Sequence, residues 1–303
     1  MRIILVTAVV ALGLAACGSN APARDSAQLR VVASFYPLAE AAHQVGGPHV
    51  VVTNLTPPGG EPHDLEPTTR QVDRILGADV VIEMGRRFQP GVEAATRHRP
   101  KGTTLAVLDQ LGIPAGSVAE EGAPGSGVDP HVWLDPTTMR SVVTAIAHTL
   151  ERLAPTPTIA TDIRGRAAAY DARLAALGSE YAAGLRTCAS RTIVTSHAAF
   201  GWLARRYHLE QRAITGLAPE QEPDPRRIAE LVDLVRTEHL TTIFTETLVS
   251  PKVARALARE AGVQTAVLDP LEGLTAARLA AGDDYLGVMR SNLQRLRTAL
   301  SCT

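Results

Sequence analysis

Residues 157–185 read PTIATDIRGRAAAYDARLAALGSEYAAGL, and this stretch decides how the chain is organised. After its first residue it contains no proline. Its apolar residues recur at intervals of three or four, the spacing of one helix face; they are Ile163, Ala167, Tyr170, Leu174, Leu177 and Tyr181. The stretch therefore predicts one helix of nearly thirty residues, roughly 40 Å long at about 1.5 Å per residue.

Short apolar runs alternate with amphipathic stretches on both sides of this helix. Before it, the sequence predicts strands at 29–35, 49–55, 79–85 and 103–110 and helices at 38–47, 67–78 and 136–154. After it, the sequence predicts strands at 191–197, 209–215, 240–247 and 263–270 and helices at 198–208, 224–239, 251–262 and 283–300. Strands that alternate with helices in this way favour parallel sheets.

We therefore predict an α/β protein with two lobes, each with a central, mostly parallel sheet flanked by helices, joined by one long spanning helix. The predicted N-terminal lobe covers residues 29–155, the linking helix residues 156–187 and the C-terminal lobe residues 188–303.

The first seventeen residues, MRIILVTAVVALGLAAC, have the features of an export signal. Arg2 precedes an apolar run of about fourteen residues, which is too short to span a bilayer and fits a secretory signal peptide. Small residues precede Cys17, as in bacterial lipoprotein signals, where the cysteine receives lipid. We predict a signal peptide at 1–17, lipidation of Cys17 and a flexible tether at 18–28.

These features predict a location outside the cytoplasmic membrane, in the periplasm or at the cell surface, with the lipid as the only membrane attachment. The formal net charge is −1 and there is no basic run, so nucleic acid is not expected as a partner. We expect a monomer.

Cys188 and Cys302 are the two cysteines left after Cys17. An even pair in an oxidising compartment predicts a disulfide. A cysteine metal site is the alternative, but two isolated cysteines without a CxxC spacing support it weakly.

Three histidines and one aspartate follow predicted strands, or lie in loops that begin there. His63 follows the 49–55 strand, His131 follows the loop at 112–128, His197 ends IVTSH and Asp269 ends TAVLD. Ligands of open parallel sheets gather at the carboxyl ends of the strands. These residues therefore predict one metal site in the cleft between the lobes.

Three imidazoles and one carboxylate suit zinc, whereas manganese prefers more carboxylate ligands. Two further carboxylates flank His63 in sequence. Glu61 could replace Asp269 as the fourth ligand. Glu66 is better explained as a helix-start residue or as a partner that supports a ligand.

The chain resembles the metal-binding receptors of ABC importers, the TroA-like (cluster 9) solute-binding family. The matching segments cover nearly the whole chain after the tether, in the order of the family; they are VVASFYPLAE (31–40), GGEPHDLEPT (59–68), DPHVWLDP (129–136), IVTSHAAFGWLARRY (193–207), IFTETLVSPK (243–252) and VLDPLEGL (267–274).

The resemblance implies two lobes joined by a rigid helix with limited hinge motion. It implies metal ligands at His63, His131, His197 and Asp269, and a supporting role for Glu246. Histidine rather than glutamate at position 197 favours zinc, with manganese as the alternative. The loop at 112–128 contains no histidine, unlike that of many zinc receptors, and this is compatible with delivery of the metal by a separate chaperone.

The function implied is capture of zinc and its delivery to a membrane permease driven by an ATPase, without catalysis. The alternative from another class is a secreted zinc hydrolase, which needs an open coordination position and a general base. Glu61, Glu66 and Glu246 are candidates for such a base, but the sequence contains no HExxH motif. A surface adhesin is a further reading with the same fold.

Overall fold

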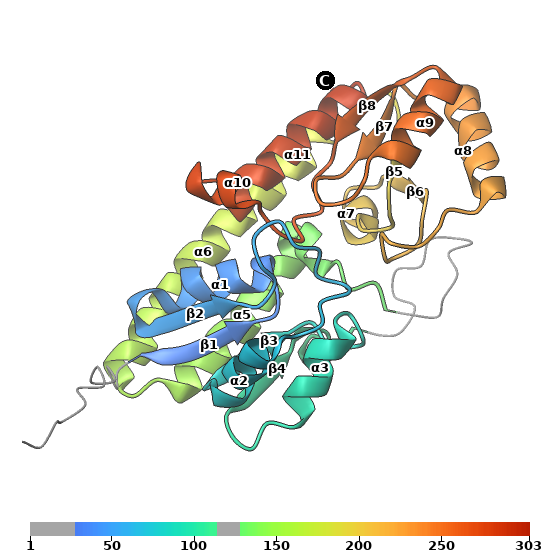
Figure 1. Cartoon of the computed structure of the whole chain (residues 1–303). Helices are drawn as coiled ribbons and strands as arrows, with labels where there is room; N and C mark the ends of the chain where they lie inside the picture. Colours follow the sequence, from blue (N-terminus) through green and yellow to red (C-terminus); the bar gives the residue numbers. More distant parts are fainter. Residues whose placement is uncertain (1–27, 114–127) are drawn as a thin grey trace, which may run out of the picture.

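The computed structural model describes residues 28–113 and 128–303, and Figure 1 shows two α/β lobes connected by one long helix. Residues 1–27, which contain Cys17 and most of the predicted tether, and most of the loop at 112–128 lie outside the described residues. Within the described residues, no helix has the length and apolar character needed to cross a membrane.

The N-terminal lobe contains a four-stranded parallel sheet in the order β2-β1-β3-β4. Its elements are β1 (Leu29–Ala33), α1 (Tyr36–Gly46), η1 (Gly47–His49), β2 (Val50–Asn54), α2 (Thr69–Gly77), β3 (Val80–Glu83), α3 (Pro90–Arg97), β4 (Thr103–Ala106), α4 (Val107–Gln110), η2 (Val132–Leu134) and α5 (Pro136–Leu153). The strand predicted at 103–110 is thus wrong in its second half, because the chain turns into a short helix after Ala106. Helix α3 was not predicted.

The C-terminal lobe repeats this arrangement with the strand order β6-β5-β7-β8, again all parallel. Its elements are β5 (Thr192–Thr195), α7 (Gly201–Arg206), β6 (Glu210–Ala213), α8 (Pro225–Thr237), β7 (Thr242–Thr245), α9 (Lys252–Ala261), β8 (Gln264–Val267), α10 (Ala276–Ala280) and α11 (Tyr285–Ala299). The two-lobed parallel α/β fold predicted from the sequence is confirmed.

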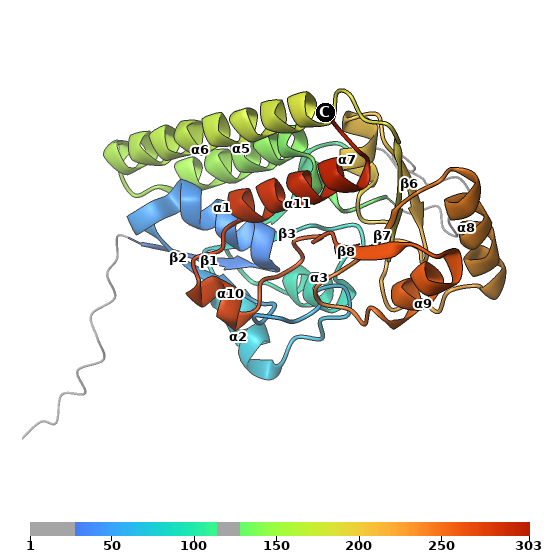
Figure 2. The ribbon, with the colours of Figure 1, turned by 90° about the horizontal axis from the view of Figure 1, so that it is seen from above.

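Helix α6 (Pro157–Gly184) is the long helix predicted from residues 157–185. The Thr156 side chain caps it by accepting a hydrogen bond from the Ile159 amide. Its buried residues are the six apolar positions on which the prediction rested. Figure 2 shows α5, α6, α1 and α11 together on one side of the sheets.

One large hydrophobic core runs through both lobes along α6. It contains side chains of α1 and α5 from the N-terminal lobe and of α7 and α11 from the C-terminal lobe. Smaller cores lie between the outer sheet faces and their helices, α2 and α3 in one lobe and α8 and α9 in the other. Because the lobes share the large core, packing against α6 fixes how they face each other.

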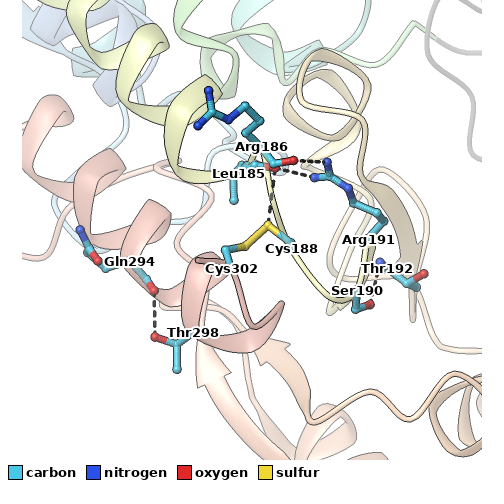
Figure 3. Close-up of a disulfide and its surroundings, with 9 residues drawn as sticks. All are labelled: Leu185, Arg186, Cys188, Ser190, Arg191, Thr192, Gln294, Thr298 and Cys302. Carbon is cyan, nitrogen blue, oxygen red and sulfur yellow. Dashed lines mark hydrogen bonds between the residues drawn. A yellow bond between two sulfur atoms is a disulfide. The ribbon is translucent and has the colours of Figure 1, made fainter.

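Cys188 and Cys302 form a disulfide across a sequence separation of 114 residues, as predicted (Figure 3). The bond attaches the end of the chain to the segment after α6. Backbone hydrogen bonds reinforce the junction, from Ala189 N to Leu300 O at 3.0 Å and from Thr303 N to Thr187 O at 3.0 Å.

Replacing both Cys188 and Cys302 with serine should destabilise the protein. For a loop of this length, the chain-entropy model predicts a loss of about 4–5 kcal/mol in the free energy of unfolding. Urea unfolding at equilibrium measures this loss. Wild-type protein in reductant is the control and should lose a similar amount; an unchanged unfolding midpoint in both cases would contradict the prediction.

Candidate metal centre

Four buried side chains from four loops meet between the lobes. His63 lies in the loop after β2, and His131 directly precedes η2. His197 lies two residues after β5, and Glu272 lies in the loop after β8. One ligand atom from each residue lies within 4.8 Å of the ligand atoms of the others. The two lobes therefore contribute two potential ligands each.

The Glu272 carboxylate is the centre of this group. Its Oε1 lies 3.1 Å from His63 Nε2, 3.4 Å from His131 Nε2 and 3.2 Å from His197 Nε2. His131 Nε2 and Glu272 Oε2 are buried and have no hydrogen-bond partner among the described residues. Buried polar atoms without partners are costly, and a cation bound by the four side chains would satisfy both. Three imidazole nitrogens and a carboxylate fit a four-coordinate zinc ion.

Two further carboxylates fix the orientation of the imidazoles. Asp129 Oδ1 lies 2.7 Å from His131 Nδ1, and Glu246 Oε2 lies 2.6 Å from His197 Nδ1. Each carboxylate also accepts the backbone amide of its histidine, at 2.9 Å and 3.0 Å. A carboxylate at Nδ1 keeps the proton there and leaves the Nε2 lone pair for a metal. Glu246 thus orients His197 and does not itself lie in the ligand group. Asp129 was missed by the sequence reasoning.

Asp269 does not lie in the ligand group, and this corrects its expected place. Its Oδ1 accepts hydrogen bonds from the Leu271 amide at 2.8 Å and from the Thr247 hydroxyl at 3.4 Å, and its Oδ2 pairs with Arg278. Both oxygens are therefore engaged away from the histidines. Glu272, three residues further on, takes the place that the sequence reasoning gave to Asp269. The segment VLDPLEGL contained the signal that could have identified Glu272, because this glutamate is a second carboxylate in the same motif.

Glu61 and Glu66 also lie outside the ligand group. Glu61 Oε1 is 3.9 Å from His63 Nε2 and accepts the backbone amide of His63 at 3.1 Å. Burial, with the neighbouring carboxylates of Glu272 and Glu220, raises the pKa of Glu61 to about 8. Glu66 is exposed and does not cap α2, since Thr68 and Gln71 form the capping box there.

Aromatic rings enclose the histidines on the side of the N-terminal lobe. The Phe88 ring lies 4.6 Å from the His63 ring, and the Trp133 ring lies 5.1 Å from the His131 ring, measured between centroids. Phe35 packs against both aromatic rings, at 5.0 Å and 4.8 Å. This apolar wall strengthens electrostatic interactions in the site, because it excludes water. Nothing in the sequence pattern singled out Phe88.

The charges of the group are strongly coupled. Burial opposes the charged form of His131, but the carboxylates of Asp129 and Glu272 outweigh it and raise its pKa above the ordinary 6.5. Burial likewise opposes the charged form of His197, but Glu246 and Glu272 raise its pKa well above the ordinary value. Burial opposes ionisation of Glu272, but the three histidines hold its pKa well below the ordinary value. Protons therefore compete with any metal for this site.

Comparison with known proteins agrees with this fold. Residues 31–299 match the family described as zinc-uptake complex component A, periplasmic (ZnuA). The zinc-binding lipoprotein AdcA of Streptococcus pneumoniae is 38% identical over 304 residues, which cover 97% of this chain and 60% of AdcA. The high-affinity zinc uptake system protein ZnuA of Bacillus subtilis is 32% identical over 311 residues, which cover 98% of this chain and 97% of that protein.

Solved structures give the same result. The laminin-binding protein Lmb of Streptococcus agalactiae, described as a bifunctional protein with adhesin and metal transporting activity, has a TM-score of 0.79 and 30% identity, covering 90% of this chain and 99% of Lmb. Zn(II)-bound AdcA from Streptococcus pneumoniae has a TM-score of 0.75 and 35% identity, covering 90% of this chain and 58% of AdcA. The chain thus spans about three fifths of the length of the AdcA relatives.

The fold and the site define a two-lobed α/β protein with a histidine-rich candidate metal centre between the lobes. The chain belongs to the zinc-uptake component A (ZnuA) family, and the resemblance to TroA-like receptors read from its motifs is confirmed.

Zinc affinity should fall as the pH falls from roughly pH 8 to pH 6, because zinc binds only the neutral imidazoles of His131 and His197. The raised pKa values extend this competition above the ordinary histidine range. Titration calorimetry in two buffers of different ionisation enthalpy measures both the affinity and the protons released. Affinity that is constant over this range, with no proton release, would contradict the expectation.

The stability of the metal-free protein should show the opposite pH dependence. A raised histidine pKa stabilises the folded state fully below the unfolded value of about 6.5, and that stabilisation is lost as the pH rises through the folded pKa. Thermal unfolding of metal-free protein over the same pH series tests this. Variant H43Q, which changes an exposed histidine of α1 outside the site, is the control and should keep the wild-type slope.

Replacing Glu246 with glutamine should weaken zinc binding by roughly 10- to 100-fold, the usual cost of losing a partner that orients a histidine ligand. The glutamine side chain is neutral, so it can accept a hydrogen bond from His197 Nδ1 but lacks the negative charge of the carboxylate. Competition against a chelator measures the change. Variant E238Q, in the exposed segment after α8, is the control; equal affinities for E246Q and E238Q would show that Glu246 does not support the site.

Proposed function

We propose that this protein is the extracytoplasmic solute-binding receptor of an ABC importer, which captures zinc between its lobes and delivers it to a membrane permease driven by an ATPase. The observation that supports this most directly is the set of four buried ligand atoms, three from imidazoles and one from a carboxylate, supplied equally by the two lobes. His63, His131, His197 and Glu272 are the proposed zinc ligands.

Zinc is favoured over manganese as the cargo. The donor set has three nitrogens and one carboxylate, which suits zinc, whereas manganese prefers oxygen ligands. The names of the relatives point the same way: AdcA is called a zinc-binding lipoprotein, and ZnuA a zinc uptake protein. Zinc passes through the site and leaves it unchanged, so the donor atoms need to bind and release it.

Binding without catalysis is the second part of the proposal. A catalytic zinc keeps one coordination position for water or substrate, whereas here four protein donors surround one centre. Glu246, a candidate general base, has both oxygens engaged with His197. The donor set therefore supports a receptor better than a hydrolase.

The proposed placement in the cell follows from the sequence. We propose cleavage of the signal peptide, a lipid on Cys17 and a tether at 18–28 that carries lobes at 29–155 and 188–303 joined by the helix at 156–187. The description of AdcA as a lipoprotein supports this placement. The mature protein would act as a monomer at the outer face of the cytoplasmic membrane.

Protein purified without added metal should contain zinc, at one ion per chain, and should keep it in the presence of excess manganese. Elemental analysis by mass spectrometry measures both. Variants H131A and E272Q should lose the ion under the same dialysis, because each removes one of four donors. Retention of manganese in preference to zinc would contradict the assigned cargo, and full zinc occupancy in E272Q would contradict the assigned ligand set.

Uptake by cells tests the receptor role itself. Cells whose only copy of the gene encodes H131A should take up radioactive zinc more slowly than wild-type cells when external zinc is scarce. Equal uptake by the two strains, with H131A protein present at the membrane, would contradict a role in import.

A further inference from the structure

The segment between β8 and Glu272 is fixed at Asp269. The backbone amide of Asp269 donates to Asn292 Oδ1 at 3.0 Å, and Asn292 Nδ2 donates to the Asp269 carbonyl at 2.7 Å. Asn292 lies on α11 and is fully buried. One side chain thus satisfies both backbone groups of Asp269, which places this residue relative to the shared core.

The Asp269 side chain then turns the chain toward the histidines. Its Oδ1 accepts the Leu271 amide at 2.8 Å, the pattern of an aspartate that bonds to the backbone two residues further on. Leu271 has φ of 54°, in the left-handed region that a leucine rarely adopts. This turn directly precedes Glu272, so the direction of the Glu272 side chain depends on it.

Two partners hold the turn from outside. Arg278, on α10, pairs with Asp269 Oδ2 through Nη1 and with Asp283 through Nε at 2.6 Å. From the N-terminal lobe, Trp133 Nε1 donates to the Pro270 carbonyl at 2.8 Å. Asp269 is 1% exposed, so without Arg278 its buried charge would have no cationic partner among the contacts described for it. A buried carboxylate that loses its partner is an uncompensated charge, which is strongly destabilising.

We propose that Asp269 and Arg278 form a positioning pair that sets the conformation of the 269–272 turn and thereby places Glu272 among the three histidines. The inference rests on the proposed metal-binding function and adds two residues to it that do not touch the metal. Asp269 acts through Glu272, and Arg278 acts through Asp269.

The sign of the effect separates positioning from simple electrostatics. Variant R278Q removes a positive charge near a cation site, which by charge alone should strengthen zinc binding. Positioning predicts the opposite, a weakening by roughly tenfold, the scale seen when a residue that orients a ligand is lost. Variant R278K keeps the charge but lacks the fork that reaches both Asp269 and Asp283, and it should recover part of the affinity.

A double-mutant cycle on zinc affinity tests the inference. Zinc dissociation constants of full-length wild type, R278Q, E272Q and R278Q/E272Q are measured by competition against a chelator. If Arg278 acts through Glu272, R278Q should weaken binding roughly tenfold in the wild-type background and less than about twofold in E272Q, because residues in one network are not additive. Variant R290Q, which removes an exposed pair between α11 and Glu180 of α6, is the control and should leave affinity unchanged.

Each outcome has one meaning. Equal fold-losses from R278Q in both backgrounds, or tighter zinc binding by R278Q, would overturn the positioning pair while the proposed function stands. Wild-type protein that binds no zinc would overturn the proposed function and this inference with it. Variants D269N and D269A provide a second test. D269A, which also loses the acceptor for the Leu271 amide, should lose more zinc affinity than D269N. The reverse order would overturn the role of the turn.

Discussion

The buried contact between Glu272 and three imidazoles is the interaction on which the site depends. A carboxylate that is 1% exposed has lost its hydration, and this costs several kcal/mol unless charged partners compensate it. The histidines around Glu272 hold its pKa well below the ordinary value in the metal-free protein, and a zinc ion bound by the same side chains would compensate its charge in their place. Both arrangements need all four side chains in position. This requirement explains why several neighbouring residues orient these four side chains without belonging to the ligand group themselves.

The fold supplies the geometry that this contact requires. Parallel sheets direct the carboxyl ends of their strands to one edge, and in this molecule both edges face the boundary between the lobes. Helix α6 packs against both lobes through one continuous core. The four ligand segments are thus placed by packing before any ion arrives. Binding to such a prearranged site loses less conformational entropy than binding that must order the loops.

Much of the fold and part of the candidate site could be predicted from the sequence. The spacing of apolar residues in 157–185 identified α6, and the alternation of strands and helices identified two parallel sheets. His63 and His197 were singled out because each follows a strand, where the position of a residue in the sequence translates directly into its position in space. His131 was singled out because it follows the loop at 112–128. The pairing of Cys188 with Cys302 followed from their number and the expected compartment.

Glu272 was missed for a physical reason. The prediction placed the fourth ligand at the strand end, at Asp269, but the chain makes a tight turn there with Leu271 in a left-handed conformation. Such a conformation leaves no sequence signal when glycine is not used. Phe88 was missed because it matters only through its contact with His63, from another part of the chain. Asp129 was missed because its role depends on how its side chain turns toward the Nδ1 atom of His131, two residues further on. Sequence patterns report periodicity and chain position, whereas these roles depend on side-chain contacts.

The contacts between the lobes also determine which movement could open the site. Large rotation of one lobe would separate the shared core along α6 and expose buried apolar surface, at about 25 cal/mol per Å². The ligand segments are joined across the same boundary by polar contacts, which include those of Glu272 with His63 and His131 and the hydrogen bonds from Gly59 N to Leu274 O at 3.0 Å and from Trp133 to Pro270. A typical hydrogen bond contributes only about 1 kcal/mol net. Separation of the loops that carry His63 and Glu272 would break these polar contacts and leave the shared core intact, so we expect release of a bound ion to involve movement of these loops and not rotation of whole lobes.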